Sequence, residues 1–217
     1  MRLTVIGASG GIGRELVRQG LAAGHEVTAV LRESAGSAAA LQDWAGTGGR
    51  PEVAVVDGLT ATDLLEPVRG RDAVASALGP HGRTADPTVN SRGVRAAVEA
   101  MQRTGVRRIV AVSAAPLAPA SGSVLDRRLV RPLLWRAFRA HYEDLARMEA
   151  ERRGSGLDWT VVRPPKLTNR PARGRQPRTA VDAPLAGAAF LSRADVAAAM
   201  LRALADPATT GHALALG

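Results

Sequence analysis

The chain has 217 residues, 46% of them hydrophobic and 23% charged, a composition that suits one globular α/β domain with helices on both faces of a sheet. It contains no cysteine, which excludes disulfide bonds, thiolate metal sites and cysteine nucleophiles. No apolar run approaches the roughly 20 residues that span a bilayer, and the first strand leaves no room for a signal peptide, so we expect a cytoplasmic protein without a membrane segment.

Arginine supplies almost all of the positive charge, since Lys166 is the single lysine and the formal net charge is +9. A basic surface attracts nucleic acid without regard to sequence. However, aromatic rings alternate with arginines only between Arg131 and Arg139, where Trp135 and Phe138 make a poor stacking platform. We therefore expect a small-molecule partner rather than nucleic acid, bound by a monomer or a homodimer.

The first predicted strand, Leu3–Ile6, runs into a glycine-rich turn and then into an amphipathic helix. Gly7 turns the chain off the strand, and Gly13 lets the helix pack close to the sheet. Gly10 and Gly11 leave the backbone open to a pyrophosphate, toward which the first N–H groups of the helix point, that of Ile12 included. The pattern predicts a phosphate cradle for a dinucleotide; the alternative is a structural turn that binds nothing.

The second predicted strand, Val27–Leu31, ends at Arg32, where this kind of fold faces the adenosine ribose. An acidic residue there would bind the 2′-hydroxyl of NAD. A guanidinium instead pairs with the 2′-phosphate of NADP, and the hydroxyl of Ser9 lies nearby. We therefore predict NADP(H) as the cofactor, although Glu33 tempers the local charge and Arg32 could also be a solvated strand end.

Two further strands end in candidate nucleotide contacts. The third, Val53–Val56, is followed by Asp57 and Gly58; Asp57 either binds the adenine amino group or caps the next turn. The fourth, Ala73–Leu78, ends at Gly79, so we expect Leu78 and Gly79 beside the ribose and the pyrophosphate.

The fifth strand, Ile109–Val112, delivers Ser113, which could orient a substrate carbonyl beside the nicotinamide or be a capping or turn serine. Within region 114–140, a loop is followed by the arginine-rich segment Leu125–Arg139, which is either a basic lid or, as we favour, a surface helix. A helix over His141–Arg153 and a sixth strand, Trp159–Arg163, follow. Pro164, which stops this strand, is placed at the cofactor site, and the histidines at 81 and 141 lie where the substrate opening is expected.

The last part of the chain, residues 164–217, is predicted to form most of a small substrate portion within the single domain. It begins with a loop over Arg170–Pro184 near the substrate mouth. Ser192 and Asp195 then make a near capping box for the last helix, and a strand over Ala213–Leu216 closes the sheet. No His, Asp and Glu set in the sequence has the spacing of a metal site.

Taken together, the sequence resembles the atypical short-chain dehydrogenases/reductases, in particular the group of NmrA-like proteins and NADPH-dependent biliverdin/flavin reductases. The resemblance covers essentially the whole chain, and it implies a Rossmann-type, doubly wound parallel sheet in the order 3-2-1-4-5-6-7. The segments that carry it are Gly7–Gly13, Arg32, Val56–Thr60, Ser155–Pro165 and Leu191–Ala197.

The chain departs from this superfamily at the Tyr-x-x-x-Lys pair, in which lysine lowers the pKa of a catalytic tyrosine. Tyr142 is followed four residues later by Ala146. We therefore expect hydride transfer to a planar, conjugated acceptor of the flavin, tetrapyrrole, quinone or enone type, with a proton from water or from Ser113, His141 or Tyr142. The arginine-rich mouth suits an anionic acceptor. The alternatives are an NADP-sensing regulatory protein of the NmrA kind and a redox-neutral isomerase.

Overall fold

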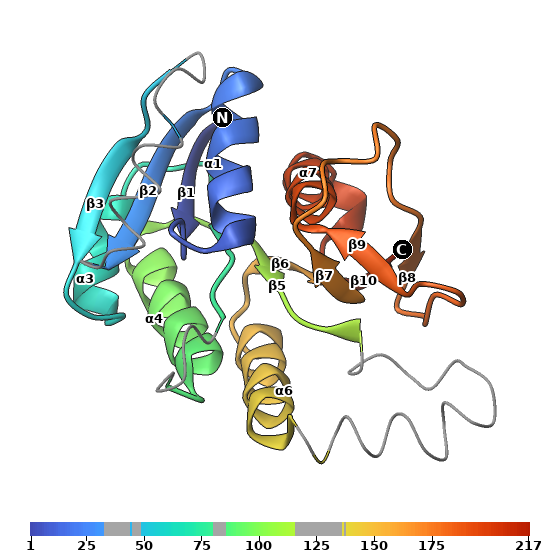
Figure 1. Ribbon diagram of the computed structural model, residues 1–217. Helices are drawn as coiled ribbons and strands as arrows, with labels where there is room; N and C mark the ends of the chain where they lie inside the picture. Colours follow the sequence, from blue (N-terminus) through green and yellow to red (C-terminus); the bar gives the residue numbers. More distant parts are fainter. Residues whose placement is uncertain (33–43, 45–48, 80–85, 116–135, 137) are drawn as a thin grey trace.

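The computed structural model describes residues 1–32, 44, 49–79, 86–115, 136 and 138–217. Within these ranges a main sheet has eight strands: β1 (Arg2–Ile6), β2 (Glu26–Arg32), β3 (Glu52–Val56), β4 (Ala73–Ser76), β5 (Arg108–Val112), β6 (Asp158–Arg163), β8 (Thr179–Val181) and β10 (His212–Leu216). They follow the order β3-β2-β1-β4-β5-β6-β10-β8, parallel throughout except between β10 and β8 (Figure 1). A small second sheet pairs β7 (Lys166–Thr168) with β9 (Phe190–Ser192).

The helices of the described ranges cover both faces of the main sheet (Figure 1). They are α1 (Gly11–Ala22), α3 (Ala61–Val68), α4 (Val89–Thr104), α6 (Arg139–Arg153) and α7 (Arg193–Ala205), with a 3-10 turn over Pro207–Thr209. α1 packs against α7 on one face, whereas α4 packs against α3 and α6 on the other. The Rossmann-type doubly wound sheet and its order 3-2-1-4-5-6-7 are therefore confirmed, with β10 as the seventh strand.

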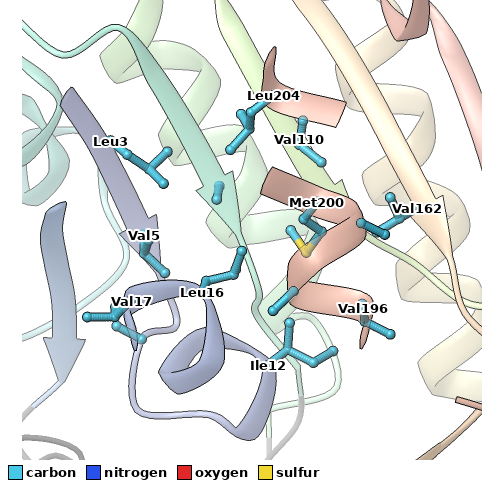
Figure 2. Packing of buried hydrophobic residues seen from close by; sticks show 14 of the residues in the cluster. Leu3, Val5, Ile12, Leu16, Val17, Val110, Val162, Val196, Met200 and Leu204 are labelled. Atoms are coloured by element: carbon cyan, nitrogen blue, oxygen red, sulfur yellow. The ribbon is translucent and has the colours of Figure 1, made fainter. Parts of the chain in front are cut away.

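Two separate hydrophobic clusters explain this arrangement, because successive residues of a strand face opposite sides of the sheet. Val5 belongs to the cluster under α1 and α7, and the next residue, Ile6, belongs to the cluster under α3, α4 and α6; both are fully buried. Figure 2 shows the first cluster, in which Leu16 of α1 and Met200 of α7 lie over the strands. Strands buried on both faces read as continuous apolar runs, which is why they were predictable.

Three predictions about the strands need correction. Ala213–Leu216 does not close the sheet, because β8 lies outside β10 and pairs with it in antiparallel fashion. β8 falls within Arg170–Pro184, which was predicted to be a loop; three residues are too few for a periodic pattern to show. The fourth strand ends at Ser76 rather than Leu78, because its neighbour β1 ends at Ile6, the partner of Ser76, and turns away at Gly7. The side chain of Leu78 packs on Gly93 of α4, where a Cβ would lie 2.2 Å from Leu78 Cδ1.

The helix termini show one cap that was predicted and one that was not. Ser192 accepts a hydrogen bond from the backbone N–H of Asp195 at the start of α7, as the near capping box predicted. α4 has no side-chain cap from its own N-cap residue. Instead, Asp144 of α6 accepts hydrogen bonds from the backbone N–H groups of Asn90 and Ser91 and also from both of their side chains. A buried carboxylate on one helix therefore caps its neighbour.

Two sequence predictions concern residues outside the described ranges, namely His81 and most of the arginine-rich region 114–140. None of the helices that the structure describes combines the length and the apolar character needed to cross a membrane. Within 164–217, α7 and β10 belong to the main layers, so the part of the predicted substrate portion that stands apart from them is the β7–β9 sheet and its connections.

Candidate functional site

The glycine turn between β1 and α1 is packed so closely that side chains would not fit. Gly7 has a φ of 80°, in the left-handed region, and a Cβ there would lie 2.9 Å from the carbonyl oxygen of Ala77. A Cβ on Gly13 would lie 2.1 Å from the carbonyl oxygen of Gly7. Because Gly13 has no Cβ, the first turn of α1 packs directly against the backbone of Gly7 at the end of β1.

The N-terminus of α1 is open to an anion. Its N-cap residue is Gly10, which offers no side-chain cap, and its first turn carries no acidic residue. The N–H of Arg14 makes the first bond of the helix, to the carbonyl of Gly10, so the amides of Gly11, Ile12 and Gly13 have no partner within the helix. Unpaired N–H groups at the positive end of a helix dipole suit a diphosphate. The turn therefore fits the dinucleotide predicted from the sequence.

The other predicted nucleotide contacts lie at the same edge of the sheet. Parallel register pairs Arg32 at the end of β2 with Val56 at the end of β3, and Asp57 and Gly58 follow. Leu78 and Gly79 follow β4, whose register brings Ser76 beside Ile6. The helix that follows, α3, is capped by Thr60 in a capping box with Asp63, and not by Asp57. Nucleotide binding by Ser9, Arg32, Asp57, Gly58, Leu78 and Gly79 stays a prediction.

Beneath the predicted nicotinamide end of the site lies a buried ionic cluster. Its centre is Glu149 of α6, which is 3% exposed. The carboxylate accepts hydrogen bonds from Ser113 Oγ (2.7 Å), from Arg163 Nε and Nη2 (3.0 and 2.6 Å) and from Arg152 Nη2 (3.1 Å). Pro164 follows Arg163, and its carbonyl oxygen accepts from the N–H of Ala115 at 3.0 Å. The tips of β5 and β6 are thus joined to α6.

The charges and hydrogen bonds around Glu149 keep this carboxylate ionised. Burial alone would raise the pKa of Glu149, but hydrogen bonds from Arg163 and Ser113 and the charges of Arg163 and Arg152 outweigh it and lower the pKa. Burial also lowers the pKa of Arg152 to about 10, against the opposing effect of Glu149. Because Glu149 is ionised, Ser113 donates its single hydroxyl proton to it. In this arrangement Ser113 has no proton to donate to a substrate carbonyl, and its oxygen can only accept a hydrogen bond from an N–H or O–H group.

His141 and Tyr142 lie apart from this cluster. They are in the first turn of α6, and eight residues separate His141 from Glu149, or about 12 Å along the helix. Tyr142 is 8% exposed and packs in the core with α4. Burial raises its pKa, whereas a catalytic tyrosine needs a lowered one. The structure therefore does not bring Ser113, His141 and Tyr142 together as one catalytic group.

His141 retains the features of a proton-transfer group. Its Nδ1 is buried with no hydrogen-bond partner among the residues that the structure describes, and burial lowers its pKa against the opposing charge of Asp144. A neutral imidazole at neutral pH can hold or pass on one proton. No group of His, Asp and Glu side chains in the described ranges is arranged to hold a metal ion.

Sequence reasoning missed Glu149, Arg152 and Arg163 as a unit. The helical spacing of Glu149 and Arg152, three residues apart, indicated an ion pair, and Arg163 ends a run of apolar strand residues. The sequence did not show that the guanidinium of Arg163 donates hydrogen bonds to the carboxylate of Glu149 as well. It also missed Asp144, whose partners lie on another helix.

Comparison with known proteins agrees with this geometry. The NAD(P)H-binding family matches residues 7–207. YhfK of Bacillus subtilis, named an uncharacterised sugar epimerase, is 30% identical over 228 residues, which cover 100% of this chain and 94% of YhfK. Two solved structures share the fold. They are the oxidoreductase ylbE of Lactococcus lactis (TM-score 0.74, 17% identity, 100% and 90% of the two chains) and the anaerobilin reductase ChuY of Escherichia coli O157:H7 (TM-score 0.73, 21% identity, 100% and 96%).

Proposed function

The chain belongs to the NAD(P)H-binding family, whose cofactor is a nicotinamide nucleotide, and we propose that it is an NADPH-dependent reductase that transfers hydride to a planar, conjugated acceptor. The observation that carries the proposal is the open, glycine-lined N-terminus of α1, with Arg32 at the adjacent strand end. The resemblance of the sequence to atypical short-chain dehydrogenases/reductases, and the fold shared with ChuY and ylbE, support an oxidoreductase.

The state of two predicted proton donors in the described part of the chain, Ser113 and Tyr142, supports the choice of acceptor. The nucleotide supplies a hydride when bound. Ser113 donates its proton to Glu149, and burial raises the pKa of Tyr142, so neither is prepared to protonate an alkoxide. A flavin, quinone, tetrapyrrole or enone spreads the incoming charge over a conjugated system, and water then suffices as the proton source.

A small pocket whose lining includes three arginines supports an anionic acceptor. These arginines are Arg173, Arg175 and Arg178, from the segment after β7, and Asp195 at the start of α7 also lines the pocket. Asp195 is already hydrogen-bonded to Ser192 and to the N–H of Arg173, and its single negative charge is outnumbered by the three arginines. Carboxylate groups on an acceptor would be attracted there.

The test is oxidation of NADPH by the purified protein with a panel of flavins, quinones, enones and linear tetrapyrroles. We expect loss of the reduced nicotinamide absorbance with at least one class. If NADPH binds in a calorimeter but no member of the panel oxidises it, the reductase proposal is wrong and the NADP-sensing alternative gains support.

The preference for NADPH over NADH is proposed on the position of Arg32 and is tested separately. Replacing Arg32 with Glu reverses the charge that would meet the 2′-phosphate, so NADPH should bind far more weakly while NADH changes little. Arg103→Glu, at an exposed position near the C-terminus of α4, makes the same change in net charge and is the matched control. Equal losses for both nucleotides in the Arg32 variant would contradict the assignment.

A redox-neutral isomerase is the second candidate, because the relative YhfK is named a sugar epimerase. Such an enzyme would return the hydride to its substrate. It would form product from a nucleotide sugar with no net change in nicotinamide absorbance, which separates it from a reductase in the same assay.

A further inference from the structure

Arg193, the first residue of α7, lies across the N-terminus of α1. An ideal Cβ on Gly11 would lie 2.5 Å from Arg193 Cδ and 2.8 Å from its Nε. The arginine stem therefore fills the space that a side chain at position 11 would occupy. Figure 2 shows the neighbouring contact, in which Ile12 of α1 lies toward Val196 of α7, so that the first turns of the two helices lie side by side.

The guanidinium of Arg193 has no anionic partner among the described residues. Its hydrogen bond goes to the side-chain oxygen of Asn169, a neutral group. The acidic residue in the first turn of α7, Asp195, is bonded to Ser192 and to the N–H of Arg173 instead.

This position is electrostatically unfavourable for a cation. Arg193 is at the positive end of its own helix and also beside the positive end of α1, whose first amides are unpaired. Two helix termini and a guanidinium together are stabilised by an anion placed between them. An anion held by the N–H groups of Gly11 and Ile12 lies next to the arginine stem.

We propose that Arg193 binds the diphosphate of the nicotinamide nucleotide, together with the first-turn amides of α1. The inference rests on the proposed nucleotide-binding function and adds a side-chain ligand from the far end of the chain. In this reading Gly11 is glycine for two reasons, since it exposes its N–H and leaves room for the arginine stem. Asn169 holds the guanidinium in place.

The experiment measures the affinity of the full-length protein for NADPH and for NADH by calorimetry. Replacing Arg193 with Ala should weaken both nucleotides by the same factor, about tenfold or more, because both carry the diphosphate. Arg32→Ala should instead change the ratio between the two. Arg103→Ala, which removes one exposed arginine near the opposite edge of the sheet, should leave both affinities unchanged.

Thermal unfolding without nucleotide separates a binding role from a structural one. Removing a cation from two helix N-termini should leave the midpoint of the Arg193→Ala variant unchanged or raise it. A second variant, Gly11→Ala, should lose affinity in the wild-type background by displacing Arg193, and should lose much less when Arg193 is already Ala.

The outcomes distinguish this inference from the proposed function. If the wild type binds neither nucleotide, the proposed function fails. If it binds NADPH and the Arg193→Ala variant binds equally well, the inference about Arg193 is overturned while the proposed function stands. A loss for NADPH alone would also overturn it, because Arg193 would then contact the 2′-phosphate.

Discussion

Replacing Glu149 with Gln tests the buried ionic cluster directly. The substitution keeps the shape of the side chain and removes the negative charge that is hydrogen-bonded to both Arg152 and Arg163. Both guanidinium groups are almost fully buried, with 1% and 9% of the side chain exposed. Leaving buried charges without a counter-ion costs about 3–5 kcal/mol. Arg153 also approaches Glu149, but its side chain is 57% exposed, so its loss adds little.

Arg152 provides the matched control, because it is the surplus cation of the cluster. Within the described ranges its Nε and Nη1 have no hydrogen-bond partner, and its guanidinium carbon lies 3.7 Å from the centre of the Trp159 ring. Replacing it with Met should change stability by about 1 kcal/mol or less in either direction, because relief of burying the charge offsets the lost ring contact. In that background Glu149→Gln should cost less, since one buried cation remains instead of two.

The assay is urea unfolding at neutral pH followed by far-ultraviolet circular dichroism, which avoids the fluorescence of Trp159 within the cluster. For a chain of this size, 3–5 kcal/mol corresponds to a fall in Tm of about 6–20 °C. The argument is wrong if Glu149→Gln lowers the free energy of unfolding by less than about 1 kcal/mol. It is also wrong if the effects of Glu149→Gln and Arg152→Met on that free energy are additive, because the cluster would then not hold α6 to the strand tips.

Three further predictions follow from the same contacts. The pKa of Glu149 is lowered in the folded protein from its ordinary value of 4.5. The ionised carboxylate therefore stabilises the fold fully above pH 4.5, and this stabilisation is lost as the pH falls below 4.5. The unfolding free energy should consequently fall more steeply with acid in the wild type than in Glu149→Gln. Asp144→Ala should lower stability by about 2–4 kcal/mol in urea unfolding, because it uncaps α4 and leaves buried donors unpaired, and Asp144→Asn should recover part of the loss. Gly13→Ala should lower stability by about 2 kcal/mol or more, because the new Cβ would lie against the backbone of Gly7. Gly10→Ala is the comparison: its Cβ would lie 3.3 Å from the nearest atom, so this variant should fold almost normally but bind nucleotide less well.

The sheet could be predicted because its causes are local. Strands such as β2 are apolar runs buried on both faces, and the helices between them carry one apolar face. The glycine turn was predictable for the same reason, since strand, turn and helix are adjacent in sequence. β7, β8 and β9 were missed because three residues carry no periodicity, and their pairing depends on the main sheet being in place.

The candidate site was only half predictable, because its other half is made by contacts between distant segments. Ser113 and Glu149 are 36 residues apart, and nothing at either position indicates that the serine proton is committed to the carboxylate. Arg193 looked like one residue of a helix start. Its contact with Gly11 arises only because α1 and α7 share one face of the sheet with their N-termini at the same edge.

These tertiary contacts constrain how the chain can act as an enzyme. Ser113 is hydrogen-bonded to Glu149, and Tyr142 is packed in the hydrophobic core. In the described part of the site, these two hydroxyl side chains therefore stabilise the fold and are not placed to protonate a substrate. What remains for catalysis is binding and orientation. If the proposed function is correct, discrimination between acceptors comes from shape and charge at the pocket lined by Arg173, Arg175 and Arg178. If the proposed function is correct, neutralising them one at a time should raise the KM for an anionic acceptor and leave the KM for a neutral quinone unchanged; equal effects on both would place the acceptor elsewhere.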